Sequence, residues 1–494
     1  MLAYFSTRNK EIKASPSEAI LRGLAPDGGL FVPSDLKELS LDWEKTIAKD
    51  YRGMAEEIFA KFFPDITDDI PEVVAKSYEG KFDTEDITPL KKLKDGYILE
   101  LFHGPTCAFK DVALSALPNL MRAAAAKEGL DDEILILTAT SGDTGSAAMR
   151  GFSGVNGTTI SVFYPDEGIS EIQRLQMTTQ EAKNVSACAI RGNFDAAQRG
   201  VKEIFRSMSK PAQGVALSSA NSINIGRLVP QIVYYFAAYK QLVESGDIEK
   251  GERISFTVPT GNFGDIMAGW FAKEMGLPIG RLVCASNRND VLEEFINTGH
   301  YDINRNFYST TSPSMDILIS SNLERLLFYT CSDANTASYM KSLEECGEYD
   351  VTAAQLENIK SIFAGASSSD EEGNHAIRAL MENEGYLIDP HTAIGCASYA
   401  KFQQSDRAKD DGCKLVNVVL ATASPYKFPV AVMKALGIST SANDLDNLEK
   451  LERVARTAAP PQLKGVFEKE VVSSDVIDPA QMKEYVRKKV NDIG

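Results

Sequence analysis

Residues 133–165 read EILILTATSGDTGSAAMRGFSGVNGTTISVFYP, and this stretch decides the fold class. Two short runs, EILILTAT and TTISVFYP, are apolar and rich in β-branched residues, and a small-residue stretch typical of a helix separates them. Strands that are apolar on both faces and alternate with helices indicate a parallel sheet covered by helices on each side. The stretch therefore predicts an α/β fold.

The same alternation continues along the chain. SACAIRG and FDAAQRGVKEIFRSMS follow directly, and a second series begins with GVALSSA and continues through RISFTVP, RLVCAS and LVNVVLATAS. Two series predict two parallel-sheet, three-layer α/β domains, with ligands at the carboxyl ends of the strands between them. Helical patterns at both ends of the chain predict an N-terminal helical extension and C-terminal helices. We expect units at residues 1–96, 97–212, 213–440 and 441–494, with a polar excursion over 287–327 in the third.

Composition and charge narrow the classes of partner. A formal charge of -17 over 494 residues leaves no basic stripe for a nucleic acid backbone. Seven cysteines between Cys107 and Cys413 form no CxxC pair and no zinc spacing, so we expect reduced thiols, a cytoplasmic location and no metal site. No apolar run approaches the ~18 residues of a membrane helix, and the first residues lack the apolar core of a signal peptide.

Lys110 is the first candidate for chemistry. It follows a Gly-Pro turn in FHGPTCAFKDVALSAL, and the residues after it are rich in helix formers up to about Lys127, so it falls at a helix N-terminus. The helix dipole, together with partial burial beside Phe102 and Phe109, would lower the pKa of the amine and give the neutral nucleophile that forms a Schiff base with an aldehyde. For a single lysine considered alone, a side chain that extends into solvent is the commoner explanation.

A first glycine-containing loop, TATSGDTGSAAM at residues 138–149, joins a predicted strand to a helix. Its hydroxyls and amides lie at a helix N-terminus, an arrangement that holds a carboxylate or a phosphate. The candidates for binding a substrate carboxylate are Thr140, Ser141, Gly142, Asp143 and Thr144. The loop lacks the Gly-Lys-Ser/Thr ending of a triphosphate site, and an ordinary βα turn with Ser/Thr capping also explains it.

A second loop, VPTGNFGDIMAG at residues 258–269, repeats the pattern. Gly261 and Gly264 let the backbone approach a ligand, and amides up to Asp265 suit a phosphate monoester, although a plain glycine turn is the alternative. Because a carboxylate repels phosphate, we expect Asp265 to cap the helix or to contribute its backbone amide. Together with Lys110 and the first loop, this cradle completes the parts that a pyridoxal phosphate enzyme needs.

The sequence resembles the threonine synthase family, which consists of fold-type II pyridoxal phosphate enzymes of the tryptophan synthase β superfamily. It is similar to the longer type found in enteric bacteria and fungi, and the resemblance covers nearly the whole chain. The motifs that carry it are LRGLAPDGGLFVP, LFHGPTCAFKD, TATSGDTGSAA, NSINIGRLVPQ, PTGNFGDI, SPSMDILISSNLERLL, DPHTAIG and ATASPYKFP.

The resemblance implies cofactor roles for named residues. Lys110 would be the catalytic residue that holds the cofactor aldehyde, and Thr422 would meet the pyridine nitrogen with a neutral hydroxyl. The residues that would line the cofactor phosphate are Gly261, Asn262, Phe263, Gly264 and Asp265. Many related enzymes have asparagine where this chain has Asp143, so it stays open which member of that loop contacts the cofactor and which the substrate.

A substrate that carries a phosphate needs a local cation in a protein of charge -17. Arg227 and Asn224, in NSINIGRL, are the first candidates, with Lys427 and His103 behind them. An arginine paired with an acid at a helix start is the alternative for Arg227. His391, in DPHTAIG, is expected at a helix N-terminus near the cleft.

The reaction implied by the resemblance converts O-phospho-L-homoserine and water to L-threonine and phosphate, by γ-elimination and then β-addition of water, as the last step of threonine biosynthesis. The chain would act as a monomer or a homodimer, with no nucleic acid or membrane partner. Alternatives are a related phospho-lyase that releases a 2-oxo acid, a serine or threonine dehydratase, and a non-catalytic ligand-binding protein. A nucleotide-binding dehydrogenase is disfavoured because the first βα turn lacks GxGxxG.

Overall fold

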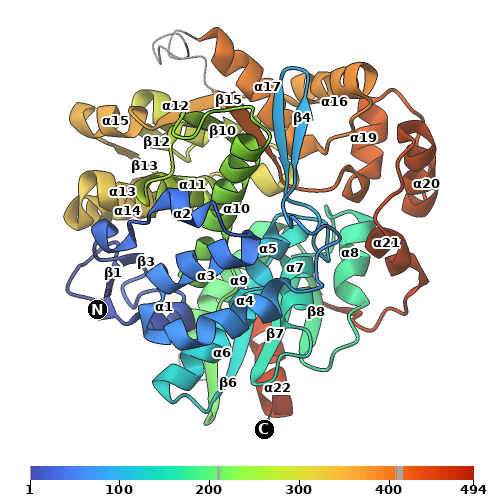
Figure 1. The fold of residues 1–494 in the computed structure, drawn as a ribbon. Coiled ribbons are helices and arrows are strands. Elements are labelled where there is room, and N and C mark those ends of the chain that lie inside the picture. The colour runs from blue at the N-terminus through green and yellow to red at the C-terminus, as the bar shows by residue number, and fades with distance from the viewer. Residues whose placement is uncertain (1, 209–211, 406–407, 409–415, 494) are drawn as a thin grey trace.

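The computed structural model describes residues 2–208, 212–405, 408 and 416–493, so Cys413 lies outside the described residues. Two parallel α/β units lie one above the other in Figure 1, and the N-terminal segment packs against their left side in that view. A six-stranded sheet has the order β14-β11-β10-β15-β5-β4, and a five-stranded sheet has the order β16-β8-β7-β6-β9. The predicted fold class is therefore confirmed.

The six-stranded sheet is parallel except for the hairpin of β4 with β5. Its strands are β4 (Leu90–Leu93), β5 (Gly96–Glu100), β10 (Ile254–Pro259), β11 (Ile279–Ser286), β14 (Phe363–Ser367) and β15 (Val416–Ala421). The surrounding helices are α10 (Ile225–Glu244), α11 (Gly264–Glu274), α12 (Val291–Thr298), α13 (Leu323–Cys331), α14 (Asp333–Cys346), α15 (Ala353–Lys360), α16 (Asp370–Glu384), α17 (Pro390–Gln404) and α19 (Pro429–Ala435), with short turns η3 (Pro313–Met315) and η4 (Pro425–Lys427). The predicted excursion, 287–327, includes α12, η3 and β12 (His300–Asp302), which pairs with β13 (Glu348–Asp350).

The five-stranded sheet is parallel throughout. Its strands are β6 (Glu133–Ala139), β7 (Thr158–Pro165), β8 (Val185–Ile190), β9 (Val215–Ser218) and β16 (Asp475–Ile477). Its helices are α5 (Lys110–Leu114), α6 (Leu117–Glu128), α7 (Asp143–Phe152), α8 (Glu171–Thr178) and α9 (Phe194–Ser207). The stretch that predicted the fold class thus forms β6, α7 and β7.

The terminal segments surround these two units. The N-terminal elements are β1 (Tyr4–Ser6), β2 (Lys13–Ala14), α1 (Pro16–Arg22), β3 (Phe31–Pro33), η1 (Leu36–Leu39), α2 (Trp43–Thr46), α3 (Tyr51–Phe62), η2 (Pro64–Asp69) and α4 (Ile70–Tyr78). The C-terminal elements are α20 (Asp444–Ala455), α21 (Pro461–Lys464), η5 (Gly465–Glu468), η6 (Pro479–Gln481) and α22 (Met482–Ile493), in addition to β16. The expected N-terminal and C-terminal helices are present.

Strand pairing departs from the expected unit boundaries at three places. β5, expected in the unit 97–212, pairs with β15 in the six-stranded sheet, and β9, expected in the unit 213–440, pairs with β6 in the five-stranded sheet. The tail after residue 440, expected to be helical, supplies β16 to the edge of β8. Strand membership depends on hydrogen-bond partners brought by the crossovers, which local apolar patterns do not reveal.

The helix expected after Lys110 is also interrupted. α5 ends at Leu114, and α6 begins at Leu117 with Pro118 in its first turn. Proline has no N–H to continue the helical ladder, but its fixed φ suits a helix start, so the sequence SALP ends one helix and begins the next.

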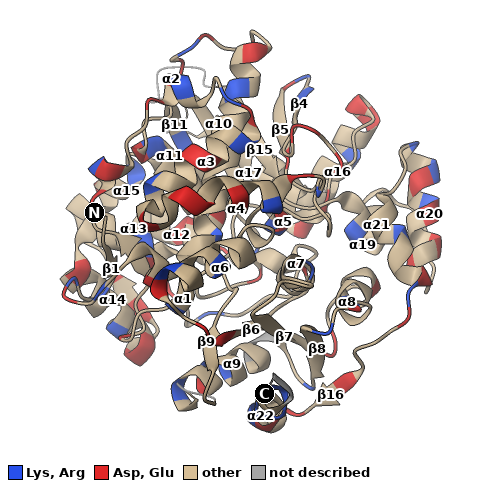
Figure 2. Ribbon diagram, turned by 60° about the horizontal axis from the view of Figure 1, so that its bottom comes forward, with Lys and Arg blue, Asp and Glu red and all other residues tan. Residues whose placement is uncertain are grey.

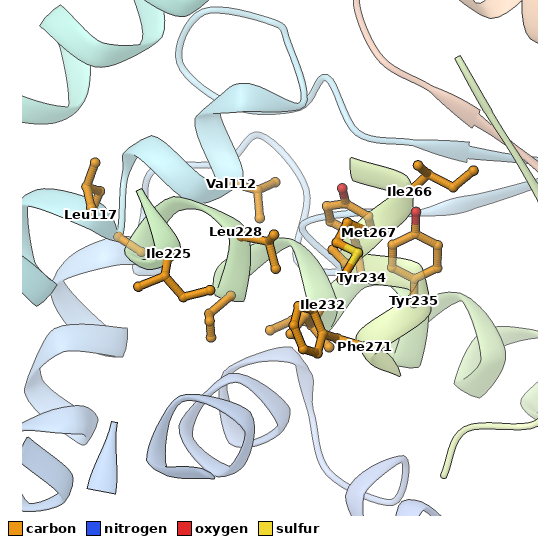
Figure 3. Close-up of a cluster of buried hydrophobic side chains, with 14 of the residues drawn as sticks. Val112, Leu117, Ile225, Leu228, Ile232, Tyr234, Tyr235, Ile266, Met267 and Phe271 are labelled. Atoms are coloured by element: carbon orange, nitrogen blue, oxygen red, sulfur yellow. The ribbon is translucent and has the colours of Figure 1, made fainter. Parts of the chain in front are cut away.

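A buried core lies between the lysine helix and the six-stranded sheet. Val112 of α5 lies near Leu228 of α10, and Ile232 lies near Met267 and Phe271 of α11, in Figure 3. All five side chains are fully buried. This packing fixes α5 relative to α11, and the residues at the N-termini of these two helices include both Lys110 and the second glycine loop.

Acidic and basic positions are interspersed along the outer helices in Figure 2, for example on α20. None of the helices in the described part of the chain combines the length and apolar character that a bilayer crossing requires.

Replacing Gly151 with alanine is expected to lower the free energy of unfolding by about 1–3 kcal/mol. A Cβ on Gly151, in α7, would lie 2.0 Å from the carbonyl oxygen of Leu114 in α5. This clash outweighs the gain of up to about 1 kcal/mol that alanine gives over glycine in a helix. Urea unfolding measures the effect. Gly465→Ala is the control, because nothing lies within 4 Å of its added Cβ, and equal midpoints for the two variants would contradict the prediction.

Candidate active site

The sequence around Lys110 forms a compact turn that places the lysine inside the protein. The carboxylate of Asp111 accepts hydrogen bonds from the N–H and hydroxyl of Thr106, at 2.8 and 2.7 Å. A Cβ on Gly104 would lie 2.4 Å from the Cβ of Asp111, so this close approach requires glycine. The N–H of Phe109 donates to the carbonyl of Thr422 at 2.8 Å, which fastens the turn to the end of β15.

Lys110 is the first residue of α5, and only 8% of it is exposed. Burial lowers the pKa of its amine, Arg227 and Lys427 lower it further, and Asp143 opposes the shift. Its Nζ lies 3.5 Å from Asp143 Oδ2 and 4.7 Å from the centre of the Phe109 ring. Because α5 has only five residues, its dipole contributes little, and burial with neighbouring cations replaces the expected dipole effect.

Asp143 is the charged centre of the site. It is 2% exposed, and its Oδ1 lies 2.7 Å from Lys427 Nζ and accepts a 2.9 Å hydrogen bond from Gln173. Burial would raise the pKa of this carboxyl, but Lys427 and Lys110 outweigh burial and hold the pKa well below its usual range. Asp143 is therefore ionised and binds both lysines.

The rest of the first loop offers amides to a ligand. The hydroxyl of Thr140 accepts hydrogen bonds from the N–H groups of Gly142 and Gly145, both at 2.9 Å, so Thr140 shapes the loop. Gly142 has a φ of 131°, a conformation that favours glycine. The amides of Ser141, Asp143 and Thr144 have no acceptor among the described residues.

The second loop has the form of a phosphate cradle. The main-chain N–H groups of residues 261–266 have no acceptor in the part of the chain that the structure describes. Phe263 has a φ of 60° at the start of α11, and a Cβ on Gly261 would lie 2.5 Å from the carbonyl oxygen of Ser314. Asn322 donates to the carbonyl of Asn262 at 2.9 Å and holds the loop in place.

Asp265 points away from this cradle, and of its two expected roles, cap of α11 or amide donor, the structure does not show the cap. Its Oδ1 accepts hydrogen bonds from the hydroxyls of Tyr234 and Tyr235 on α10. Burial raises the pKa of the Asp265 carboxyl to about 6. Its side chain therefore holds the loop against α10, and its backbone amide remains available to a phosphate.

Arg227 is the first of the cationic residues that were expected to bind the substrate phosphate. Arg227 is 5% exposed, donates to the carbonyl of Ala220 at 2.9 Å and has no carboxylate partner among the described residues. Burial lowers the pKa of Arg227 to about 10, so it stays charged at neutral pH. The alternative of an arginine paired with an acid is not what the structure shows.

The three other expected polar residues have protein partners. Asn224 caps α10 by accepting from the N–H of Gly226, and both of its amide donations go to backbone carbonyls. The ring of His103 lies between the carboxylates of Asp83 and Glu100, at 2.6 and 2.8 Å. His391 is in the first turn of α17, as expected, and its ring accepts from the N–H of Ser314 at 3.2 Å.

Sequence reasoning did not name Gln173 or Ser314, both of which contact Asp143. The signal for Gln173 was the capping box Ser170–Gln173 at the start of α8, which places its side chain at the amino end of that helix. No local pattern marks Ser314.

Three family descriptions match this chain: "Threonine synthase N terminus" at residues 3–78, "Pyridoxal-phosphate dependent enzyme" at 83–421 and "Threonine synthase, C-terminal" at 392–486. A threonine synthase of Pseudomonas aeruginosa is 38% identical over 478 residues, which cover 94% of this chain and 97% of that protein. This chain belongs to the threonine synthase family. A relative from Saccharomyces cerevisiae, also a threonine synthase, is 37% identical over 92% of this chain and 93% of its own length.

A solved structure agrees with the family assignment. A pyridoxal phosphate-bound threonine synthase from Brucella melitensis superposes with a TM-score of 0.85 at 37% identity, covering 99% of both chains. Like its family, this chain is a pyridoxal phosphate-dependent lyase of threonine biosynthesis with fold type II. The dehydrogenase and binding-protein alternatives are not supported.

The residues present fit the cofactor. A phosphate requires donors without acceptors, which the amides of residues 261–266 supply, and an aldehyde requires an amine of lowered pKa, which Lys110 supplies. The group would lie between the start of α5 and the start of α11.

Proposed function

We propose that this enzyme converts O-phospho-L-homoserine and water to L-threonine and phosphate, with the site residues in the roles that follow. The observation that carries the proposal is electrostatic: the side chains of Lys110 and Lys427 are buried against Asp143, and Arg227 is buried close enough to Lys110 to lower its pKa. Three buried basic groups with one ionised carboxylate among them suit a substrate that brings both a phosphate and a carboxylate into the site.

Pyridoxal phosphate, when bound, supplies an electron sink that makes protons next to an amino group removable. Lys110 would hold the aldehyde. Once its amine is free, it would take protons from Cα and Cβ and return protons to Cγ and Cα, while water adds at Cβ; its lowered pKa suits this task. The amides of residues 261–265 would bind the cofactor phosphate. Thr422, whose carbonyl accepts from the N–H of Phe109 in the lysine segment, would meet the ring nitrogen with its neutral hydroxyl.

The substrate is held at its two anionic ends. The amides of Ser141, Asp143 and Thr144 bind its carboxylate at the start of α7. Arg227 and Lys427 bind its phosphate. Lys427 is fully buried, and its Nζ lies 2.7 Å from Asp143. An ammonium group has three N–H donors, so the ion pair with Asp143 leaves donors for a phosphate.

Thr140 and Asn224 contribute to this arrangement indirectly. Each uses its side chain to shape a loop, through bonds to Gly142 and Gly145 for Thr140 and to Gly226 for Asn224. Both are buried, at 1% and 0% exposure. We therefore assign them to loop shaping and leave direct substrate contact to the amides and cations.

Product analysis tests the proposed reaction. The holoenzyme is incubated with O-phospho-L-homoserine, and threonine, phosphate and 2-oxobutyrate are quantified. We expect threonine and phosphate in equal amounts. If 2-oxobutyrate is the main product, the chain is a phospho-lyase instead, and release of neither product would reject both functions.

Arg227→Met is expected to raise KM for O-phospho-L-homoserine by about 10- to 100-fold, because a charge-assisted hydrogen bond contributes about 1.5–3 kcal/mol. The KM of Arg227→Lys, which keeps the charge, is expected to lie between the KM of Arg227→Met and that of wild type. Initial rates over a range of substrate concentrations measure the change, and the cofactor absorbance checks that the site is intact. An unchanged KM in Arg227→Met would remove Arg227 from the phosphate site.

We also propose roles for the two ends of the chain. Residues 1–96 form an extension and residues 441–494 form a tail around the two α/β units, with β5, β9 and β16 paired as described above. A cytoplasmic location is consistent with free thiols at Cys107, Cys188 and Cys284, all of which are buried. Size-exclusion chromatography with light scattering distinguishes a monomer from a homodimer.

A further inference from the structure

The turn η3 touches three parts of the active site at once. The carbonyl of Ser314 packs against Gly261 of the phosphate cradle, where a Cβ would lie 2.5 Å away. The hydroxyl of Ser314 is 3.5 Å from Asp143 Oδ2. The N–H of Ser314 donates to Nε2 of His391 at 3.2 Å. One residue thus joins the cradle, the charged centre and α17.

The tautomer of His391 follows from these partners. A backbone N–H can only donate, so Nε2 must carry the lone pair, and the ring proton is on Nδ1. Nδ1 lies 2.7 Å from Asp389 Oδ1, and that carboxylate also caps α17 by accepting from the N–H of His391 at 2.9 Å. His391 and Asp389 are 2% and 0% exposed. The imidazole is therefore neutral in this structure, and the contact between Nδ1 and Asp389 fixes its orientation.

The residues on either side of Ser314 in the turn have hydrogen-bond partners of their own. Asn287, after β11, donates to Ser312 Oγ at 3.0 Å and to Asp316 Oδ1 at 2.7 Å. Asn287 and Ser312 are fully buried. These bonds fix the ends of the turn, whereas the bond to His391 alone holds the Ser314 N–H between them.

We propose that His391 is a positioning residue, whose neutral imidazole holds η3 against the cofactor cradle and Asp143. Only a ring nitrogen with a free lone pair can accept from the Ser314 N–H, and Nε2 is that nitrogen. The charged groups that face His391 are Asp389 on α17, Asp143 on α7 and Asp316 after η3. The inference rests on the assignment of residues 261–265 to the cofactor phosphate.

Hydrogen–deuterium exchange of residues 312–316 in the full-length holoenzyme tests this role. In His391→Leu we expect exchange at Ser314 to be about 2- to 13-fold faster than in wild type, which is the range that the loss of one hydrogen bond gives. We expect cofactor release to be faster as well. His375→Leu, an exposed histidine on α16, is the control. Equal exchange in His391→Leu and wild type would overturn the proposal.

His391→Gln provides a second variant in case the leucine variant fails to fold. The glutamine oxygen can accept a hydrogen bond from the Ser314 N–H, as Nε2 of His391 does. Exchange at Ser314 in His391→Gln is therefore expected to stay close to that of wild type. Exchange in a folded His391→Gln that is as fast as in His391→Leu would overturn the proposal. Since no substrate is present, these results are independent of which reaction the enzyme catalyses.

Discussion

Replacing Lys110 with alanine is expected to abolish threonine formation and to remove the visible absorbance of the bound cofactor. Loss of acid–base catalysis alone costs about 100- to 10,000-fold in rate, and the loss of the group that holds the aldehyde adds to this. The amine suits both tasks because burial lowers its pKa, with Arg227 and Lys427 acting in the same direction. Coupled assays of phosphate release and an absorbance spectrum measure the two effects.

A matched control separates this effect from a general loss of a lysine. Lys127→Ala, on an exposed position of α6 in the same unit, is expected to keep both the activity and the spectrum of wild type. Threonine formation that is undiminished in Lys110→Ala would contradict the role assigned to Lys110.

Lys427→Met is expected to have the next largest effect. Removing one partner of a buried ion pair leaves an uncompensated charge and costs about 3–5 kcal/mol, here at Asp143. Because Lys427 lowers the pKa of Lys110, its removal raises that pKa. The neutral amine then forms only at higher pH, so the acidic limb of the kcat profile should move to higher pH while kcat/KM falls by at least about 100-fold.

The control for Lys427→Met is Lys434→Met, an exposed position on α19. Lys427→Arg keeps the charge and should retain part of the activity with an unshifted profile. A Lys427→Met enzyme with wild-type kcat/KM and an unchanged pH profile would show that the pair with Asp143 has no part in the reaction.

The two glycine-containing loops could be predicted because the residues of each are consecutive in the sequence. Apolar runs that end in glycine, serine and threonine indicated both helix N-termini, and the structure places acceptor-free amides at residues 261–266 and at Ser141, Asp143 and Thr144. Helix periodicity and unbroken strands likewise predicted the α/β architecture.

Partners across the cleft were less predictable, because they are set by tertiary packing. Asp143 was named as a loop member, but its pairing with Lys427 and Gln173 joins segments far apart in the chain. The hydroxyl of Thr140 accepts hydrogen bonds from two amides of its own loop, a role that the sequence pattern did not reveal. Local patterns give the residue types at a site, and strand pairing decides which of them meet.

The most direct test of the account is to locate the lysine that holds pyridoxal phosphate. The holoenzyme is treated with sodium borohydride, which fixes the cofactor to its lysine, and the labelled peptide is identified by mass spectrometry. We expect a single label on Lys110, in the peptide that contains GPTCAFKD. A label on Lys427 or on any other lysine, or an unlabelled Lys110 in a protein that retains the cofactor, would contradict it.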